Sequence, residues 1–420
     1  MIYIVVAIFL LFSFIRVLNI PLTSPPAIFS VIWSVFIFFS YLILSERYPF
    51  TFYGITWIFC SCFLLSLGYA FRIETKSTKT KEMESSVNSA NISWSLLAVF
   101  IFLGLTGFIL SAAKYGVSLN VFSDFDSLQS TSNSIAEQRY SGSSVGSSTL
   151  EQILNSFVYV LPLCGGYSLV YANSVRKKIL IILTAVPSLL SMLLTSAKLA
   201  VVAYTILFFV SYYVSYLYLN KKFISINYRK IFQSLFLGYI LYQLFYLSFL
   251  LRIGSTSASI SRIIVTKLGI YAFGHVQAFD LWLPIYMSSD AELGFGGNTF
   301  LAFSSLIGVL DKKQGIYELI SGSSTNVFTQ FRSLISDFGI LFGLLVIFIL
   351  GIVLRIFYKN VINYSSKLIV LQQVLFISIL FYLIYFIVSP WVYLTFVLTF
   401  FIFYFYLVVA FHFRIKIKFR

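Results

Sequence analysis

Residues 337–354 read DFGILFGLLVIFILGIVL, a run in which only the first residue is charged. A helix of about 20 apolar residues crosses the ~30 Å hydrocarbon core of a bilayer, so this run predicts a transmembrane helix. Ten more runs of this kind occur, at residues 2–18, 27–44, 51–71, 92–113, 154–173, 179–195, 199–219, 231–251, 368–388 and 391–411. The sequence therefore predicts an all-α polytopic membrane protein with about 11 transmembrane helices, in which residues 1–420 form a single integral membrane domain.

The composition supports this prediction and excludes several other classes of protein. Hydrophobic residues make up 59% of the 420 residues and charged residues 10%, whereas soluble domains have about 45–50% and about 25%. The 47 Phe and 29 Tyr argue against disorder, and three Cys are too few for a disulfide scaffold. The middle portions of the predicted spans carry no ionisable residue, which disfavours an ion-coupled carrier.

The positions of the charged residues indicate how the chain is oriented in a membrane. The chain has 29 Lys and Arg against 14 Asp and Glu, a net charge of +15. Most of the basic residues lie in alternate connections between spans, so they indicate the cytoplasmic side of a membrane and argue against a nucleic-acid surface. The N-terminus is then external and the C-terminus cytoplasmic, and two long external segments remain, residues 114–153 and 252–336.

The two external segments differ in character. Residues 114–153 are rich in Ser and Gly, which is typical of a mobile linker, but the segment also carries Arg139 and Tyr140. In residues 252–336, apolar residues recur at helical spacing between positions 260 and 272, as in a short amphipathic helix at the membrane interface. A second short helix is expected after residues 298–299, with Asn298 as its N-cap.

The most informative polar pattern is Thr325-Asn326-Val327-Phe328-Thr329-Gln330-Phe331-Arg332, just before the ninth predicted span. If a helix begins near Asn326, then Thr325, Thr329 and Arg332 lie on one face. A cation is unfavourable near a helix N-terminus unless an anion binds there, and a guanidinium beside free amides suits phosphate. The alternative is an interfacial arginine whose charged end reaches the headgroups.

Other external residues are candidates for the same site. Arg252 and Arg262 add positive charge, although each alone is more often a headgroup contact. His275 is followed five residues later by Asp280, and a neutral imidazole accepts a hydroxyl proton near neutral pH. The alternative for this pair is a purely structural role.

Several of these stretches resemble one family, the oligosaccharide repeat-unit polymerases, also called Wzy-type O-antigen polymerases. The resemblance covers residues 188–343 best and is clearest in Thr325-Asn326-Val327-Phe328-Thr329 and in Asp337-Phe338-Gly339. It also includes the stretch that ends at Lys198, where the family often has Arg, and position 328, where it commonly has Tyr. The N-terminal third is similar only in hydropathy and in having a loop with an Arg.

The resemblance implies a multi-pass glycosyltransferase of the bacterial inner membrane. Such an enzyme transfers a growing glycan from undecaprenyl pyrophosphate to a sugar hydroxyl of a new lipid-linked repeat unit at the periplasmic face. It implies neither a metal nor another cofactor, since arginine clamps would stabilise the leaving pyrophosphate. The bilayer and both lipid-linked oligosaccharides are the expected partners, together with a chain-length regulator.

Roles for individual residues follow from the resemblance. His275 is the first candidate for the general base, followed by Asp337 and Asp280. The candidate pyrophosphate ligands are Arg332, Arg252, Arg262 and Arg139, and the candidate substrate contacts are Asn326, Thr329 and Tyr140. An O-antigen ligase is the alternative function, and a lipid-linked oligosaccharide flippase is disfavoured because it needs cations along a membrane-spanning cavity.

Overall fold

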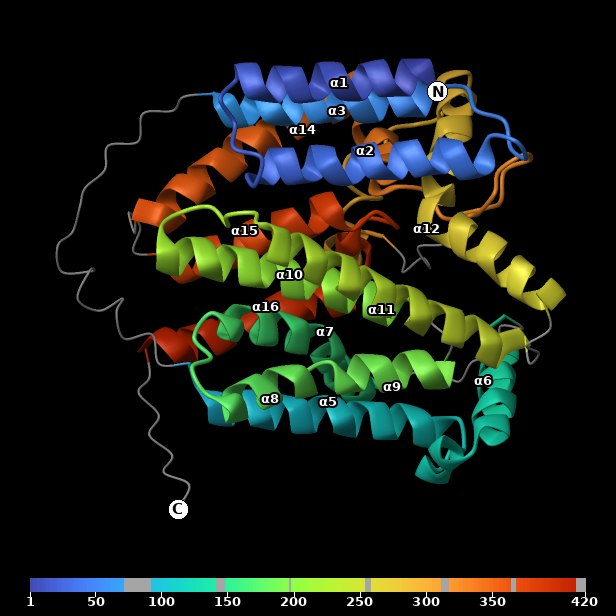
Figure 1. Cartoon of the computed structure of the whole chain (residues 1–420), viewed down its shortest axis with the longest axis vertical. Coiled ribbons are helices and arrows are strands. Elements are labelled where there is room, and N and C mark those ends of the chain that lie inside the picture. Colours follow the sequence, from blue (N-terminus) through green and yellow to red (C-terminus); the bar gives the residue numbers. More distant parts are fainter. Residues whose placement is uncertain are drawn as a thin grey trace. The chain divides into compact units, whose positions relative to one another are not determined.

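The computed structural model describes residues 1–71, 92–140, 148–195, 198–253, 258–310, 317–363 and 368–412. All regular elements within these ranges are helices, and Figure 1 shows their arrangement. The predicted all-α class is therefore confirmed for the described residues. The elements are α1 (Ile2–Val17), α2 (Pro25–Leu44), α3 (Tyr53–Ala70), α5 (Trp94–Lys114), η1 (Leu119–Ser123), α6 (Phe125–Tyr140), α7 (Thr149–Leu169), α8 (Val175–Leu183), α9 (Val186–Thr195), α10 (Leu199–Asn220), α11 (Tyr228–Ile253), α12 (Ala258–Met287), α13 (Leu301–Leu306), α14 (Gln330–Asn363), α15 (Ile369–Ile384), η2 (Pro390–Val392) and α16 (Leu394–His412).

Within the described residues, 8 helices are long and apolar enough to cross a membrane, with α8 and α9 counted as one interrupted span. They correspond to eight of the predicted spans. The other three predicted spans, residues 2–18, 154–173 and 368–388, are also largely helical. Two of these helices, α1 and α15, are only 16 residues long, and α7 contains Pro162. The chain is thus a multi-pass α-helical membrane protein.

The chain divides into two compact units. The first comprises Met1–Thr78, Thr266–Lys367 and Ser378–Leu394, and the second comprises Lys79–Val265, Leu368–Ile377 and Thr395–Arg420. In the first unit, α1 and α3 run side by side at the blue end of the colour scale in Figure 1. The candidate site described below lies wholly within this first unit.

Glycines allow the closest helix contact in the first unit. A Cβ at Gly68 of α3 would collide with the carbonyl oxygen of Phe348 in α14, and one at Gly351 would collide with the carbonyl oxygen of Leu65. Transmembrane helices associate through packing of this kind, because lipid supplies no hydrophobic force that drives helices together. The two glycines therefore seat α14 directly on α3.

Hydroxyl groups join the helices of the second unit. Ser211 and Ser215 of α10 donate to the carbonyl oxygens of Leu163 and Tyr167 in α7, at 2.6 and 2.8 Å. The Ser168 hydroxyl of α7 also hydrogen-bonds the Tyr406 hydroxyl of α16 at 2.8 Å. In an apolar medium such bonds satisfy polar groups that would otherwise lack a partner.

The predicted external segments contain more helix than expected. In residues 114–153, η1 and α6 take the place of a continuous linker, and Asp124 caps α6 by accepting from Ser127 N at 3.0 Å. The Ser- and Gly-rich residues 141–147 lie outside the described residues. In residues 252–336, the first helix is not short, because α12 continues for 30 residues and has Pro284 only in its last turn.

Two predicted helix starts are wrong. The second short helix, α13, begins at Leu301 after Phe300, because the Asn298 side chain binds Asp337 instead of capping it. The helix expected near Asn326 begins at Gln330. A local turn delays it, in which Thr325 Oγ1 accepts from Val327 N at 3.2 Å.

Candidate functional site

A break in α14 organises the candidate site. Gly339 has φ +77°, a left-handed conformation that glycine adopts easily, and it separates a short first segment of α14 from the long apolar one. Backbone carbonyls before the break lose their usual helical donors. Replacement donors come from the preceding segment: Tyr286 Oη to Ile335 O at 3.2 Å, Gly294 N to Ser336 O at 3.0 Å, and Phe295 N to Asp337 O at 3.1 Å.

The Asp337 carboxylate ties residues 294–299 to this break. It accepts from Asn298 N at 2.8 Å, Asn298 Nδ2 at 2.9 Å and Thr299 N at 2.6 Å. Gly294 must be a glycine here, because a Cβ would collide with the Asp337 carboxylate. Asp337 is fully buried and both of its oxygens already accept hydrogen bonds, so its local geometry is that of a structural anchor. Its candidacy as general base stays a prediction.

Arg332 lies in the first turn of α14, inside a box of aromatic rings. The guanidinium carbon is 3.9 Å from the ring centroid of Tyr317, 4.2 Å from that of Phe328 and 5.1 Å from that of Trp282. Tyr317 and Phe328 meet edge to face at 5.6 Å, and the Tyr317 hydroxyl lies 2.7 Å from Ser333 Oγ. The rings stabilise the cation and hold its plane in one orientation.

The Arg332 guanidinium nevertheless keeps an unused donor. Its Nη1 atom is buried and has no hydrogen-bond partner among the described residues, where Arg332 also forms no ion pair. The adjacent Thr329 hydroxyl is likewise buried without a partner. A buried donor without an acceptor is costly, typically about 1–3 kcal/mol and more for a charged group. The arrangement therefore suits an acceptor supplied by an anionic ligand.

Two titratable side chains, a carboxylate and a phenol, lie near Arg332. The charge of Glu318, an exposed carboxylate on the loop before α14, acts on the guanidinium. Burial raises the pKa of the Tyr317 phenol, although the Ser333 hydrogen bond and the Arg332 cation act in the opposite direction. Tyr317 is therefore a neutral hydroxyl at physiological pH and does not compete with a ligand for the guanidinium by forming a phenolate.

A stack of three rings lies near Asp337. Trp391 stacks on Tyr382 with centroids 4.4 Å apart and on Phe300 at 5.1 Å. The charge of Asp337 acts on Tyr382. The buried hydroxyl of Tyr382 has no hydrogen-bond partner among the described residues. Ser389, just before Trp391, donates to Thr299 O at 2.8 Å.

His275 lies deeper, among aromatic rings. It is 1% exposed, and the rings of Trp33, Phe36 and Phe386 surround it at centroid distances of 5.8, 4.8 and 4.6 Å. Neither ring nitrogen has a partner among the described residues. Burial lowers the pKa of His275 from 6.5 to about 3, so the imidazole is neutral. It can accept a proton only if a substrate reaches it, and this geometry argues against such access.

His275→Phe separates the two roles of this residue. Below pH 6.5, His275 binds a proton in the unfolded chain but not in the folded chain. The free energy of unfolding of the wild type therefore falls by up to about 1.4 kcal/mol per pH unit as the pH drops toward 3. We expect the variant to lack this loss, which thermal unfolding in detergent at pH 7.5 and pH 5 would measure. An identical pH dependence in both proteins would contradict the expectation. Loss of polymer synthesis in a stable variant would support the base assignment.

Asp280 caps the N-terminus of α3. Its carboxylate accepts from the backbone N–H groups of Thr51, Phe52 and Ile55, the last two at 2.9 and 3.1 Å. A carboxylate at a helix N-terminus satisfies free amides and interacts favourably with the helix dipole. Asp280 is fully buried, and its local geometry is that of a helix cap. Its candidacy as base stays a prediction.

The structure brings only some of the candidate residues together. Thr329, Arg332 and Asp337 are close to one another in the sequence. His275 contacts the ring of Trp33, whose other neighbour is Phe331, with ring centroids 4.7 Å apart. Asn326 is exposed on the turn before α14. The structure does not describe the side chains of the remaining four candidates. These are Arg139 and Tyr140 at the end of α6, Arg252 in α11 and Arg262 in α12.

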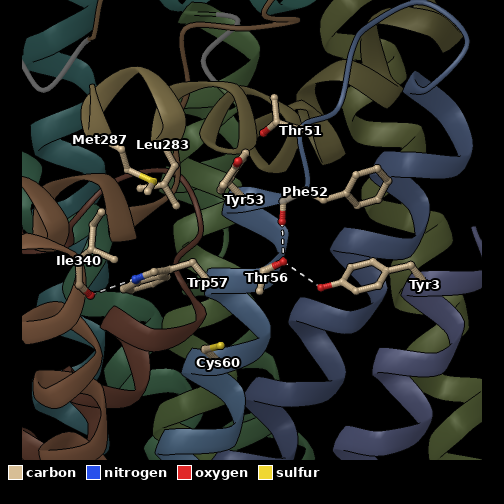
Figure 2. Close-up of a pocket in the computed structure, with 10 residues that line it drawn as sticks. All are labelled: Tyr3, Thr51, Phe52, Tyr53, Thr56, Trp57, Cys60, Leu283, Met287 and Ile340. Atoms are coloured by element: carbon tan, nitrogen blue, oxygen red, sulfur yellow. Dashed lines mark hydrogen bonds between the residues drawn. The ribbon is translucent and has the colours of Figure 1, made fainter. Parts of the chain in front are cut away.

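An apolar groove runs along α3 in the same unit. Figure 2 shows it between α1, α3, α12 and α14, lined mainly by apolar side chains and with a volume of about 620 Å³. On one side the hydroxyls of Tyr3 and Thr56 meet at 2.8 Å, and on the other Trp57 Nε1 donates to Ile340 O at 3.2 Å. The Trp57 ring also contacts Phe331 at 5.0 Å, so the groove and the Arg332 region share an aromatic wall.

The sequence reasoning missed four residues that shape the site. Trp282, Tyr317 and Phe328 form the box around Arg332. Gln277 joins distant loops, because its Nε2 donates to Pro49 O and Gly322 O and its Oε1 accepts from Ser324 N. The signal available was composition, since aromatic and amide side chains occur in the segment 252–336, which also carries basic residues.

No protein-family model, curated protein or solved structure matches this chain.

Proposed function

We propose that this protein is a glycosyltransferase that polymerises undecaprenyl-pyrophosphate-linked repeat units into O-antigen or a related surface polysaccharide. The proposed location is the bacterial inner membrane, with the reaction at its periplasmic face. The proposal rests on the family resemblance of residues 188–343 together with one structural observation. That observation is the unpartnered, buried Nη1 of Arg332, held by three aromatic rings next to a transmembrane segment.

The reaction needs a fixed cation at the membrane surface. The acceptor oxygen forms a bond to the anomeric carbon of the donor, and the bond from that carbon to the pyrophosphate oxygen breaks. Negative charge then grows on the leaving pyrophosphate, and a preorganised donor lowers the barrier because it needs no reorientation. Arg332 is our candidate for this donor.

A base must take the proton of the acceptor hydroxyl. His275, Asp337 and Asp280 remain the sequence-based candidates. All three are buried, and the two carboxylates already hold backbone amides. Glu318 is exposed and its charge acts on Arg332, so we add it as a candidate that the sequence reasoning did not include.

The proposed topology extends the observed set of helices. With α1, α7 and α15 included as spans, the chain crosses the membrane eleven times, with a periplasmic N-terminus and a cytoplasmic C-terminus. The basic connections then face the cytoplasm. Arg332, at the start of α14, then faces the periplasm, where repeat units would be joined.

The groove of Figure 2 suits the hydrocarbon part of such a substrate. Thr56→Trp would fill it from an exposed position on α3. Each buried methylene of a ligand contributes about 0.8 kcal/mol, so loss of two such contacts should raise the apparent KM for the lipid-linked donor roughly tenfold with little change in kcat. Leu67→Trp, on α3 but outside the groove, is the control, and equal kinetics in both variants would exclude the groove.

Deletion of the gene tests the proposed function as a whole. Without a polymerase, a ligase still attaches one repeat unit, so we expect lipid A-core carrying a single unit on electrophoresis of the lipopolysaccharide. Loss of a ligase would instead leave bare core and polymer stranded on its lipid carrier. The bare-core pattern would replace the polymerase with the ligase, and an unchanged ladder of long chains would reject both.

A further inference from the structure

The first half of α11 contains no buried residue in the part of the chain that the structure describes. Residues 228, 229 and 231–240 are exposed and Lys230 is half-buried, and only 17% of the apolar window of α11 is buried, the lowest share among the 8 candidate spans. Burial resumes only near the other end, at Ser248, Phe249 and Leu251. These residues anchor the helix at its C-terminal end.

A glutamine lies just beyond the end of this exposed stretch, at position 243. Gln243 is exposed, and its side chain has no hydrogen bond among the described residues. At about 100° per residue, Gln243 lies about 140° from Ser248, about 120° from Phe249 and about 80° from Leu251. It lies near the centre of the span Tyr228–Leu251, within about 5 Å along the axis.

An amide at this depth requires a partner. Hydrocarbon offers neither donor nor acceptor, so polar side chains in membrane helices bond to another helix. The Gln243 side chain cannot reach water at the helix ends as Lys or Arg does, because its stem is short. The neighbours of Gln243 on the same face are Phe232, Phe236 and Tyr239, all within about 40° of it and all exposed.

We propose that this face of α11 pairs with the same face of a second copy of the chain. Two copies insert into the membrane in the same orientation, so their α11 helices run parallel and equivalent residues meet at a two-fold axis. A primary amide is self-complementary, since it carries both a carbonyl acceptor and N–H donors. Gln243 therefore binds Gln243 of the second copy, and the aromatic side chains pack on either side.

The proposal does not depend on the enzymatic function. It needs only the membrane insertion of α11 and the position of Gln243. A loss of polymer synthesis without a change in pairing would therefore concern only the proposed reaction. A loss of pairing without a loss of polymer synthesis would concern only the proposed pairing.

Cysteine cross-linking in native membranes tests the face. The full chain carrying Gln243→Cys or Tyr239→Cys should form a dimer-sized disulfide product under mild oxidation. Leu237→Cys is the matched control, because Leu237 is 49% exposed against 59% for Tyr239 but lies about 120° from Gln243. The unsubstituted chain, with Cys60, Cys62 and Cys164, gives the background. Equal cross-linking at positions 237 and 243, or no dimer at either, would overturn the proposal.

Amide replacement tests the bond. Gln243→Leu should raise the dissociation constant of the dimer about threefold to twentyfold, the range expected for an interhelical hydrogen bond in a membrane, whereas Gln243→Asn should retain part of the affinity. Energy transfer between labelled copies in vesicles at several protein densities would measure this. Identical dissociation of Gln243→Leu and the wild type would overturn the proposal. So would protection of Gln243→Cys from a thiol reagent without any dimer, because another part of the same chain would then cover the face.

Discussion

Arg332→Ala is expected to abolish long polymer while leaving the protein in the membrane at normal abundance. Removal of one preorganised donor to a developing charge typically lowers the rate by about 10²–10³. The aromatic box should tolerate the change, because Tyr317 and Phe328 also contact each other. Complementation of a deletion strain, with polymer length and membrane abundance measured together, would show the effect.

Arg332→Lys separates a clamp from an interfacial cation. Lysine keeps the positive charge over the rings but has no planar fork, so it should not restore polymer if Arg332 binds pyrophosphate through two nitrogens. If Arg332 only reaches the headgroups, lysine should serve equally well. Arg355→Lys is the matched control, because Arg355 also lies in α14 and over tyrosine rings. Its guanidinium carbon is 5.2 Å from the ring centroid of Tyr69. Full polymer from Arg332→Lys would refute the clamp.

Asp337→Ala should cause the largest loss of stability. The change leaves the buried N–H of Thr299 and the N–H of Asn298 without their acceptor, at about 1–3 kcal/mol each. The expected total is about 3–5 kcal/mol, measured as a lower unfolding temperature or as lost abundance in membranes. Asp290→Ala, an exposed acid in the same segment, should change stability by less than about 0.5 kcal/mol.

Asp337→Asn distinguishes anchoring from catalysis at this position. The amide keeps one acceptor oxygen but turns an NH₂ toward a backbone donor, so an anchor should lose part of its stability and activity should fall with it. A general base would behave differently, because activity would vanish while the unfolding temperature stayed near that of the wild type. The second outcome would make Asp337 the leading candidate for the base in place of His275.

The sequence predicted the helices better than it predicted their ends. Long apolar runs such as residues 337–354 specify a membrane helix by length and composition alone, and all of the predicted runs are largely helical, although residues 179–195 are divided between α8 and α9. The start of α14 could not be placed, because the turn made by Thr325 and Val327 and the helical start at Asn326 are both compatible with the same local sequence. The length of α12 was underestimated because its second half is buried by contacts with α2 and α3 that no local pattern encodes.

The candidate site was predicted less completely for a similar reason. Arg332 stood out because the polar pattern of residues 325–332 places a cation near an expected helix N-terminus, where it is unfavourable unless an anion binds. Its aromatic neighbours Trp282 and Tyr317 are distant in sequence, and hydropathy treats them like any other ring. His275 and Asp280 attracted attention as titratable residues, but burial and hydrogen bonding in three dimensions determine whether such groups can react.

The break at Gly339 has a consequence for how the protein can change over evolutionary time. The apolar part of α14 is fixed by its contact with α3 through Gly68 and Gly351, whereas the part that carries Arg332 is held by residues 286–299. A continuous helix would transmit every rotation of its membrane portion to Arg332. With the break, the membrane-anchoring portion and the portion that carries Arg332 form separate modules, so variation in residues 286–299 can re-aim the guanidinium without loss of the membrane scaffold.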